Sequence, residues 1–361
     1  MEREKIVELK DIEVKFRVRD RDLTAIRRVS LDVFRGETLA IVGESGSGKS
    51  VLTKTVTGML ENNGRITNGT IMYGDLDLTK IDSYEEGSYI YEKNHDAWQQ
   101  IRGRKIATIF QDPMTSLNPL RRIGSQITEV LIHVRGFEKE EAKAEAINLL
   151  DKVGIPNPEE RFMDYPFQYS GGMRQRVVIA IALACQPEIL ICDEPTTALD
   201  VTVQAQILDL LKALTDELNI AVIFITHDLG VVANVADRVA VMYSGQIVEY
   251  GVSDDVFYNA QHPYTWALLS SLPQLGEKGV DLFAIPGTPP SLYNVIVGDA
   301  FAPRNPFAME IDFVEEPPMF QVSETHFAKT WLLDPRAPKV ERPKIVDSLH
   351  ERVMAILGGD R

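Results

Sequence analysis

The sequence predicts an α/β fold built around a parallel β-sheet, and three observations support this prediction. Apolar runs typical of buried strands alternate with helical segments through much of the chain. A glycine-rich loop of the phosphate-binding type, at residues 43–50, lies between one such run and a helical segment. The chain has 361 residues, 44% of them hydrophobic, so it can bury a large core and exceeds what one domain usually holds.

The first part of the chain is expected to form short antiparallel strands that lead into the strand before the glycine-rich loop. Residues 5–40 alternate apolar and polar side chains around a charged break at 19–22, which is the pattern of half-buried strands. Residues 66–73, which read ITNGTIMY, are expected to form a hairpin. Residues 82–100 are polar and aromatic without a clean period, and this pattern predicts a loop with a helical end.

Strands and helices alternate through the middle of the chain. Continuous apolar runs predict buried strands, and apolar residues at helical spacing predict helices. The predicted strands span 106–110, 189–192, 220–225, 238–243 and 246–250, and the predicted helices span 124–153, 173–185 and 202–218. Such alternation is typical of a parallel sheet covered by helices.

The composition changes after about residue 255. Prolines cluster between Pro286 and Pro343, which predicts a small irregular appendage. A helix at about 344–357 is expected to close it, and no internal repeat is found.

The overall composition excludes several classes of protein. The formal net charge of −15 argues against non-specific DNA binding, and no nucleic-acid partner is expected. No apolar run reaches the ~20 residues that a membrane-spanning helix needs, and the charged N-terminal segment does not have the pattern of a signal peptide. The two cysteines, Cys185 and Cys192, lie in apolar runs and are expected to be buried, reduced thiols.

The glycine-rich loop is the most informative motif. Residues Gly43–Ser50 read GESGSGKS, with an apolar run at 38–42 before them and a helical start at 51–60 after them. This arrangement points backbone N–H groups at one site, and glycines let the backbone curl there. Lys49 is expected to reach the β- and γ-phosphates of a nucleotide, and the Ser50 hydroxyl to hold Mg²⁺. The expected nucleotide-binding residues of the loop are Gly43, Ser45, Gly46, Gly48, Lys49 and Ser50.

Two acidic residues follow a predicted buried strand. The strand at 189–192 delivers Asp193 and Glu194 at its carboxyl end, which in open α/β sheets faces the ligand crevice. Asp193 is expected to bind Mg²⁺ as a partner of Ser50. Glu194 is expected to lie beside the γ-phosphate, where an attacking water needs a proton acceptor or an orienting group.

Three further residues are candidates for the same site. Gln111 follows the strand at 106–110 and is expected to hold the attacking water or to act as a Mg²⁺ ligand. His227 lies at the end of another core strand, where it can contact the γ-phosphate. Phe16 is the candidate for stacking on the adenine, and its alternative role is that of a core aromatic residue.

A second glycine-rich turn precedes a helix. Ser170, Gly171 and Gly172 lie at the expected start of helix 173–185, and a helix N-terminus of this kind attracts anions. One phosphate loop does not need two anion sites. We therefore expect two chains to face each other, each lending this turn to the other's γ-phosphate. The alternative is a plain helix-capping turn.

Together these motifs resemble the ATP-binding subunits of ABC transporters over residues 5–255. The resemblance identifies 43–50 as the Walker A loop, Gln111 as the Q-loop, YSGGM as the signature, ILICDE as Walker B and His227 as the switch histidine. It also identifies 198–200 as the D-loop, which adds Asp200 to the nucleotide-binding residues. The signature departs from the commoner LSGGQ at its first and last positions, but the serine and both glycines are retained.

The resemblance implies a domain layout. A nucleotide-binding domain at 1–255 is expected to combine a RecA-like parallel sheet, an antiparallel β subdomain and a helical subdomain at about 112–170. Residues 256–361 are expected to form an accessory region of the oligopeptide-transporter type. The segments SGGMRQR, HPYT at 262–265 and IPGTPPSL at 285–292 are similar to the oligopeptide/dipeptide permease ATPases, especially those of Gram-positive bacteria.

This similarity implies a function and partners. The chain is expected to hydrolyse ATP with Mg²⁺ and to power oligopeptide or dipeptide import, as a peripheral subunit at the cytoplasmic face of the cell membrane. The implied partners are a second ATPase subunit, often a related and non-identical chain, two transmembrane permease subunits and, indirectly, an external substrate-binding protein. Relatives also move nickel or oligosaccharides, and the sequence does not choose among these cargoes.

One departure concerns iron–sulfur chemistry. Many members of the family hold such a cluster with four C-terminal cysteines. Here the matching positions are Asp299, Asn305, Asp312 and Thr325. Because oxygen side chains do not replace thiolates on such clusters, no iron–sulfur cluster is expected.

Two other classes of function fit the sequence less well than transport. A soluble ABC-type ATPase of translation or repair would usually bring a second cassette, a coiled coil or a zinc module, and the sequence has one Walker A loop and no C-x-x-C pair. A non-catalytic, nucleotide-gated scaffold tends to lose residues such as Glu194 and His227, which are present here.

Overall fold

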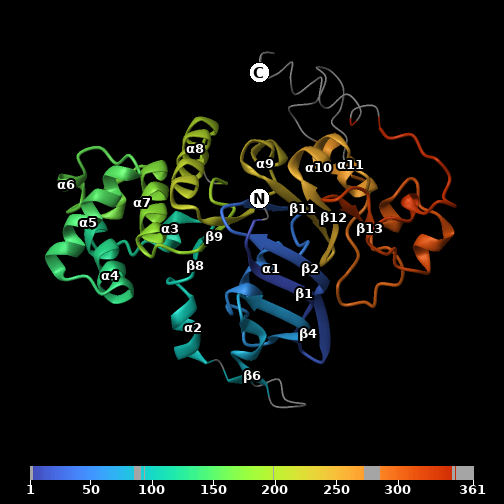
Figure 1. Ribbon diagram of the computed structural model, residues 1–361, viewed down its shortest axis with the longest axis horizontal. Coiled ribbons are helices and arrows are strands. Elements are labelled where there is room, and N and C mark those ends of the chain that lie inside the picture. Colours follow the sequence, from blue (N-terminus) through green and yellow to red (C-terminus); the bar gives the residue numbers. More distant parts are fainter. Residues whose placement is uncertain are drawn as a thin grey trace.

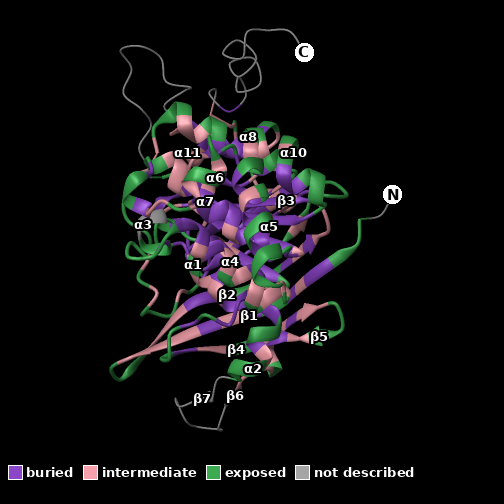
Figure 2. Cartoon of the chain, turned by 90° about the vertical axis from the view of Figure 1, so that its left-hand side faces the viewer, coloured by how far each residue is buried: buried purple, intermediate pink, exposed green. Residues whose placement is uncertain are grey.

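The computed structural model describes residues 3–84, 91–92, 94–197, 199–271, 285–343 and 346. Figure 1 shows two sheets at the centre, a group of helices at the left and the C-terminal region at the right. Buried residues gather around the larger sheet and α7 (Gly171–Ala184), and exposed residues lie on the outer faces (Figure 2). This arrangement confirms the predicted α/β class.

The smaller sheet is antiparallel and has the strand order β2-β1-β4-β5. Its strands are β1 (Lys5–Val18), β2 (Arg21–Phe34), β4 (Gly64–Tyr73) and β5 (Leu76–Asp77), with the 3₁₀ turn η1 (Leu78–Lys80) after them. Alternate residues of β1 and β2 are buried because side chains of a strand point to opposite faces. The predicted antiparallel pairing is therefore present, but the expected short strands are two strands of 14 residues each, which form one long hairpin with β4 beside it.

The predicted hairpin at 66–73 is wrong. These residues lie within the single strand β4, which pairs with β1 along its length. Gly69 adopts a left-handed φ of 89° at a register shift, and a Cβ there would come within 2.3 Å of the Lys10 carbonyl oxygen. The Asn-Gly pair therefore forms an irregularity within a strand, because β1 passes too close for the chain to turn.

The larger sheet has the strand order β13-β14-β12-β11-β3-β10-β9-β8. Strands β8, β9, β10, β3 and β11 run parallel, and β12, β14 and β13 add an antiparallel edge. The bounds are β3 (Thr38–Val42), β8 (Ile106–Ile109), β9 (Ile189–Asp193), β10 (Ala221–Ile225), β11 (Arg238–Tyr243), β12 (Gln246–Val252), β13 (Phe320–Gln321) and β14 (Phe327–Ala328). The carboxyl ends of four of the parallel strands, β8, β9, β10 and β3, meet at one edge. The phosphate loop, Gln111, Glu194 and His227 follow these strand ends, so the sheet brings them together at this edge.

The helical group at the left of Figure 1 lies between β8 and β9 in the sequence. It contains α3 (Pro113–Ser116), α4 (Ile123–Arg135), α5 (Lys139–Lys152), α6 (Pro158–Arg161), the 3₁₀ turn η2 (Pro166–Gln168) and α7. The predicted helix at 124–153 is two helices, because Gly136 takes a left-handed conformation with φ 73° and ends α4.

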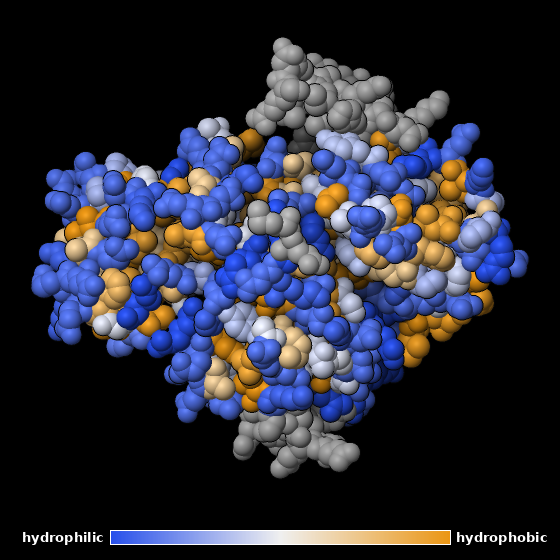
Figure 3. Space-filling view, viewed as in Figure 1, coloured by the Kyte–Doolittle hydropathy of each residue, from blue (hydrophilic) through white to orange (hydrophobic). Residues whose placement is uncertain are grey.

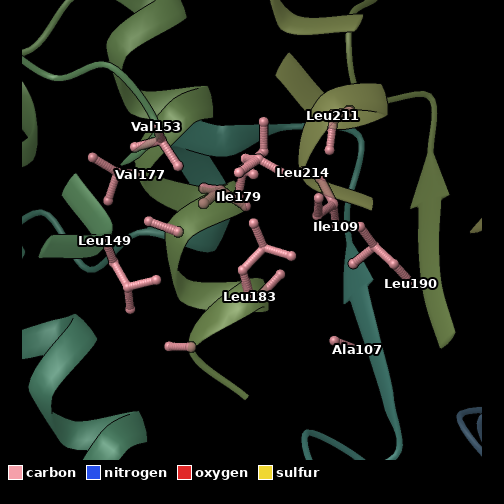
Figure 4. Packing of buried hydrophobic residues seen from close by; sticks show 14 of the residues in the cluster. Ala107, Ile109, Leu149, Val153, Val177, Ile179, Leu183, Leu190, Leu211 and Leu214 are labelled. Carbon is pink, nitrogen blue, oxygen red and sulfur yellow. The ribbon is translucent and has the colours of Figure 1, made fainter. Parts of the chain in front are cut away.

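Helix α7 forms the centre of the largest core. Its residues Val177, Ile179 and Leu183 are at most 4% exposed. Figure 4 shows Ile179 and Leu183 between Leu149 of α5 on one side and Leu190 of β9 on the other, with Val177 on the side of Leu149. A helix that is apolar on all sides is buried on all sides, so α7 joins the helical group firmly to the sheet.

The remaining helices cover the larger sheet or flank the smaller one. They are α1 (Lys49–Val56), α2 (His95–Ile101), α8 (Val201–Leu218), α9 (Leu229–Val235), α10 (Ser253–Tyr258) and α11 (Pro263–Ser270). The expected helical end of 82–100 is α2, which follows the short strands β6 (Ser83–Tyr84) and β7 (Tyr91–Glu92). Residues 85–90 and 93 lie outside the described residues.

The C-terminal region continues the larger sheet. Strand β14 pairs with β12, and the 3₁₀ turns η4 (Ala302–Arg304), η5 (Glu310–Phe313) and η6 (Trp331–Leu333) complete the region. The rings of Tyr243, Tyr264 and Phe301 pack together, with centroids 4.5–5.3 Å apart. A domain boundary at residue 255 stays a prediction. Apart from residue 346, the helix expected at 344–357 lies outside the described residues.

The character of the surface and the burial of the two cysteines follow the expectations from the composition. The face shown in Figure 3 is largely hydrophilic, with hydrophobic patches that include one at the right, over the C-terminal region. Among the helices that the structure describes, none combines the length and the apolarity needed to cross a bilayer. Cys185 and Cys192 are buried and free, and burial raises the pKa of the Cys185 thiol to about 11.

Candidate active site

A cavity of about 1000 Å³ lies where the carboxyl ends of β3, β8, β9 and β10 meet the β1–β2 hairpin. It is lined by Phe16, Val18, Leu23, Ala25, Ser45, Gly46, Gly48, Lys49, Ser50, Val51, Glu61, Asn63, Gln111, Asp193, Glu194, Thr197, His227 and Leu292. The lining divides by element: the hairpin supplies apolar side chains, and the loop and strand ends supply polar ones. Such a cavity suits a ligand with one apolar and one charged end.

The phosphate loop encloses its lysine. Lys49 is buried, and its Nζ donates to the carbonyl oxygens of Gly43 at 2.7 Å and of Glu44 at 3.0 Å. Burial lowers the pKa of Lys49, and the nearby carboxylates of Glu194 and Asp193 oppose this effect. A cation held this way at the start of α1 favours a bound anion, because the free N–H groups of the helix start point to the same place.

Two glycines of the loop have conformations that other residues avoid. Gly43 has φ 149°, and a Cβ there would lie 2.1 Å from the Met242 carbonyl oxygen. Gly48 has φ 107°, and a Cβ there would lie 3.0 Å from the Ala25 carbonyl oxygen. The loop therefore fits between β11 and β2 only with glycine at these positions.

Ser50 and Asp193 form the oxygen pair that the sequence predicted. The Ser50 Oγ donates to the Asp193 Oδ1 at 3.3 Å. Burial raises the pKa of Asp193, Glu194 raises it further, and the hydrogen bond from Ser50 and the charge of Lys49 oppose the rise. Hydroxyl and carboxylate oxygens are the ligands that Mg²⁺ accepts, and a cation there would offset the repulsion between two adjacent carboxylates and a phosphate chain. The donor set therefore fits Mg²⁺.

Glu194 is the centre of a hydrogen-bonded group. Its carboxylate accepts from Gln111 Nε2 at 3.0 Å and from Thr197 Oγ1 at 3.1 Å, and it lies 3.2 Å from His227 Nδ1. Its backbone is left-handed, with φ 48°, and its N–H donates to the Ile225 carbonyl at 3.0 Å. A left-handed backbone is strained for a residue other than glycine, and such strain persists at functional sites because the surrounding structure holds the backbone in place.

The sequence predicted three members of this group and missed the fourth. Gln111, Glu194 and His227 follow three different strands, and the fold brings them together at one edge. Thr197 was not predicted, although its hydroxyl lies three residues after Glu194 in the turn that follows β9. That spacing was the available signal, since a side chain three residues further along a tight turn can reach back.

Phe16 lies on the apolar side of the cavity and is half-buried. It pairs with Leu23 across the hairpin and faces Gly64 on β4, where a Cβ would come within 2.5 Å of its ring. Val18 and Ala25 extend the same apolar wall and were not predicted. The absence of a side chain at Gly64 leaves room for the ring, so the strand pairing fixes where Phe16 can lie.

The predicted residues of the second glycine-rich turn lie outside this cavity. Ser170 caps α7, its Oγ accepting from the Met173 N–H at 3.3 Å, and the exposed Asp200 caps α8, accepting from the Val203 N–H at 3.0 Å. Neither residue lines the cavity, nor do Gly171 and Gly172. Within the part of the chain that the structure describes, this turn and the phosphate loop do not share one pocket.

Comparison with protein families gives two matches. Residues 26–197 match a family described as ABC transporter, and residues 248–311 match one described as oligopeptide/dipeptide transporter, C-terminal region. The first match contains the phosphate loop and Glu194. The second contains HPYT and most of the region that packs on Tyr243.

Individual relatives are similar over nearly the whole chain. The oligopeptide transport ATP-binding protein AmiE of Streptococcus pneumoniae is 61% identical over 99% of this chain and 98% of its own length. The dipeptide transport ATP-binding protein DppD of Lactococcus lactis is 55% identical, covering 94% of each chain. OppD of Bacillus subtilis, an oligopeptide transport ATP-binding protein, is 54% identical over 95% of this chain and 93% of its own length.

Solved structures share the fold of the nucleotide-binding part. The ATP-binding cassette MJ0796, in a dimeric post-hydrolysis state bound to ADP and Pi, aligns with a TM-score of 0.58 and 28% identity, over 68% of this chain and 98% of that one. The Clostridium perfringens protein cbiO1, part of an ABC transporter complex, aligns with a TM-score of 0.58 and 26% identity, over 70% of this chain and 91% of that one.

Proposed function

This chain belongs to the ATP-binding proteins of ABC transporters, and we propose that it hydrolyses ATP to power the import of oligopeptides or dipeptides across the cell membrane. The observation that carries this proposal is its full-length similarity to oligopeptide and dipeptide transport ATP-binding proteins. The match of residues 248–311 to the C-terminal region of such transporters supports peptide cargo over nickel or oligosaccharide. The same similarity favours transport over a soluble ABC-type ATPase.

The cavity is proposed to hold ATP, as expected for an ABC ATPase. Phe16 lies against the base, and the loop from Gly43 to Ser50 holds the phosphates, with Lys49 reaching the β- and γ-phosphates. Ser50, Asp193 and Gln111 are the residues proposed to hold Mg²⁺. When bound, Mg²⁺ supplies charge neutralisation for the β- and γ-phosphate oxygens.

Glu194 is proposed to orient the attacking water and to accept its proton. The hydrogen bonds from Gln111 and Thr197 fix one carboxylate oxygen, and His227 lies beside the other. This leaves His227 able to contact both Glu194 and a γ-phosphate. The three catalytic residues, Glu194, His227 and Gln111, therefore act as one hydrogen-bonded unit.

A second ATPase chain is proposed to complete the site. Ser170, Gly171, Gly172 and Asp200 lie outside this chain's own cavity and face solvent or are half-exposed, so they are free to contact a nucleotide held by another chain. The dimeric state of the cassette MJ0796 is compatible with such pairing. We expect the partner to be a related chain that need not be identical.

The other partners are proposed from family membership. Two transmembrane permease subunits and, indirectly, an external substrate-binding protein would place this chain as a peripheral subunit at the cytoplasmic face of the membrane. Leu120 and Phe167 of the helical group are 86% and 71% exposed. We propose that both side chains belong to the surface, within residues 112–168, that meets the permease subunits.

The C-terminal region is proposed to fold without an iron–sulfur cluster. Asp299, Asn305 and Asp312 are buried, and each accepts a backbone N–H group within its own turn. The donors are the N–H groups of Phe301, Phe307 and Met309, at 2.9, 2.9 and 2.7 Å. Thr325 is exposed and donates to Asp255. Iron and sulfide analysis of protein purified without oxygen tests this point.

Reconstitution tests the proposed function. The chain is purified from solubilised membranes with its companions, which are identified, and the complex is placed in liposomes with the external receptor. We expect ATP hydrolysis that peptides stimulate and peptide uptake that requires ATP. Uptake of nickel or oligosaccharide alone would overturn the assignment of peptides as the cargo. Recovery of the chain without membrane subunits would overturn the proposed role in transport.

A further inference from the structure

The segment 285–292 of the C-terminal region lies against the edge of the smaller sheet. Strand β2 is the edge strand of that sheet, and the Thr24 N–H donates to the Leu292 carbonyl oxygen at 3.2 Å. Thr24 lies between Leu23 and Ala25, which both line the cavity. One backbone hydrogen bond therefore places the end of this segment beside the apolar wall of the nucleotide site.

The start of the segment is held to the phosphate loop. Arg304 Nε donates to the Pro286 carbonyl at 2.8 Å, and Nη2 lies 3.4 Å from the Ile285 carbonyl. The same guanidinium pairs with Glu44 of the loop. The segment is thus fixed at both ends, once to the element that would bind phosphates and once to the hairpin that would bind the base.

Leu292 is the one residue of the C-terminal region, as far as the structure describes it, that lines the cavity. It is half-buried and completes an apolar surface with Phe16, Val18 and Leu23. The polar side chains of the lining, among them Lys49, Ser50, Asp193 and Glu194, belong to the phosphate loop and the strand ends, where the phosphates would lie. A purine ring has two apolar faces, and burying them against aromatic and aliphatic side chains is favourable.

We propose that Leu292 forms part of the base subsite and that the C-terminal region thereby sets the affinity of the site for the nucleoside part of ATP. This proposal rests on the assignment of the cavity to ATP. It assigns Leu292 no role at the phosphates or in the chemical step. Loss of its side chain is expected to weaken binding of a nucleotide and to leave binding of a phosphate chain alone unchanged.

The test uses the full chain in its assembled complex. Leu292→Ala is expected to raise the KM for ATP roughly 5- to 30-fold, since it removes most of one aliphatic contact surface, with kcat within about twofold of the original. The inhibition constant of inorganic tripolyphosphate, measured against ATP, should not change. Leu292→Met retains a long apolar side chain and should restore most of the affinity.

A matched control lies just after this segment in the sequence. Val295 is 91% exposed and does not line the nucleotide cavity, so Val295→Ala removes an apolar side chain three residues away and should leave the KM unchanged. The proposal is overturned if Leu292→Ala leaves the KM for ATP unchanged, or if it weakens tripolyphosphate as much as ATP. Failure of the proposed function would instead appear as a wild-type complex without ATP turnover or without peptide uptake. A complex without ATP turnover would also overturn the base subsite. A complex that hydrolyses ATP without taking up peptides would still allow the KM values of the variants to be compared.

Discussion

Arg304 in the C-terminal region makes a two-pronged ion pair with Glu44, the second residue of the phosphate loop. The Nη1–Oε2 and Nη2–Oε1 distances are 2.7 and 2.9 Å, and the two residues are 260 positions apart in the sequence. Glu44 is also fixed through its backbone, since its N–H donates to the Tyr264 hydroxyl oxygen at 2.8 Å. The loop is therefore held by two residues of the region that matches the oligopeptide/dipeptide transporter family.

Breaking this ion pair is expected to destabilise the chain. The Arg304 side chain is 5% exposed, so Arg304→Ala leaves Glu44 without its partner and is expected to lower the free energy of unfolding by about 2–3 kcal/mol. Denaturant unfolding measures this change in the free energy of unfolding. A double-mutant cycle with Glu44→Gln separates the interaction energy of the ion pair from the other effects of the substitution. Arg336→Ala is the control, because Arg336 is 84% exposed and pairs with Asp334 at the surface. A change below 0.5 kcal/mol for both arginines, expected only of surface pairs, would contradict the prediction.

Glu194→Gln is expected to abolish turnover while sparing ATP binding. The amide retains a similar shape but cannot take the proton of the attacking water, so kcat should fall by about 100-fold or more. Phosphate release by the assembled complex measures the rate, and size-exclusion chromatography with ATP should show the two ATPase chains trapped together. Glu141→Gln, on the exposed side of α5, is the control. Normal hydrolysis by the Glu194 variant would assign the base elsewhere.

Two glycines of the phosphate loop are expected to respond differently to alanine. At Gly43 a Cβ would lie 2.1 Å from the Met242 carbonyl, whereas at Gly46 it would meet nothing within 4 Å. Both have left-handed φ values, 149° and 79°. Gly43→Ala should therefore lower the free energy of unfolding by about 3 kcal/mol or more, and Gly46→Ala by about 1 kcal/mol. Equal losses in denaturant unfolding would show that β11 yields to the added methyl group.

Asp299 is expected to make stability depend on pH in an unusual direction. Burial raises the pKa of this carboxyl group to about 6, above its value in the unfolded chain. Between about pH 4 and pH 6 the folded chain thus holds the proton more tightly, and this contribution to stability is present in acid and lost as the pH rises. By pH 7 the ionised group costs about 3 kcal/mol at most.

The substitution Asp299→Asn tests the direction of this pH dependence. Asparagine retains an oxygen that can accept from the Phe301 N–H, which lies 2.9 Å away, and it carries no charge. The variant should be more stable than the original at pH 7.5, with a difference that shrinks toward pH 4.5, as measured by thermal unfolding of both proteins side by side. Asp334→Asn is the control, since its pKa is lowered to about 2 by Arg336 and its neutralisation should bring no gain. A less stable Asp299 variant at pH 7.5 would refute the prediction.

The fold class and much of the site followed from local patterns. Buried apolar runs identify core strands, and parallel strands align their carboxyl ends, so the sequence alone predicts Gln111, Asp193 and His227 at one edge of the sheet. The Asn68–Gly69 pair led to the wrong prediction of a hairpin, because residues that favour turns also occur at irregularities within strands. Whether the chain turns or continues depends on how closely β1 passes. A local pattern does not contain that distance.

Other site residues depend on contacts between distant segments. Leu292 reaches the cavity because Thr24 binds its carbonyl and Arg304 holds the start of its segment, and neither contact leaves a periodic signal in the sequence. Val18 and Leu23 line the cavity only because the hairpin projects over the loop. Residues that pack in three dimensions without a shared motif are found only once the fold is known.

The continuation of the larger sheet into β14 affects how the chain behaves if it is shortened. Without the C-terminal region, the backbone groups of Glu249 and Tyr250 that pair with β14 would be left open. Exposed strand edges recruit other strands and lead to aggregation. At this edge the intact sheet ends instead in strands of two residues, which are too short to serve as templates. Proteolytic removal of this region would therefore yield insoluble material rather than a smaller working ATPase.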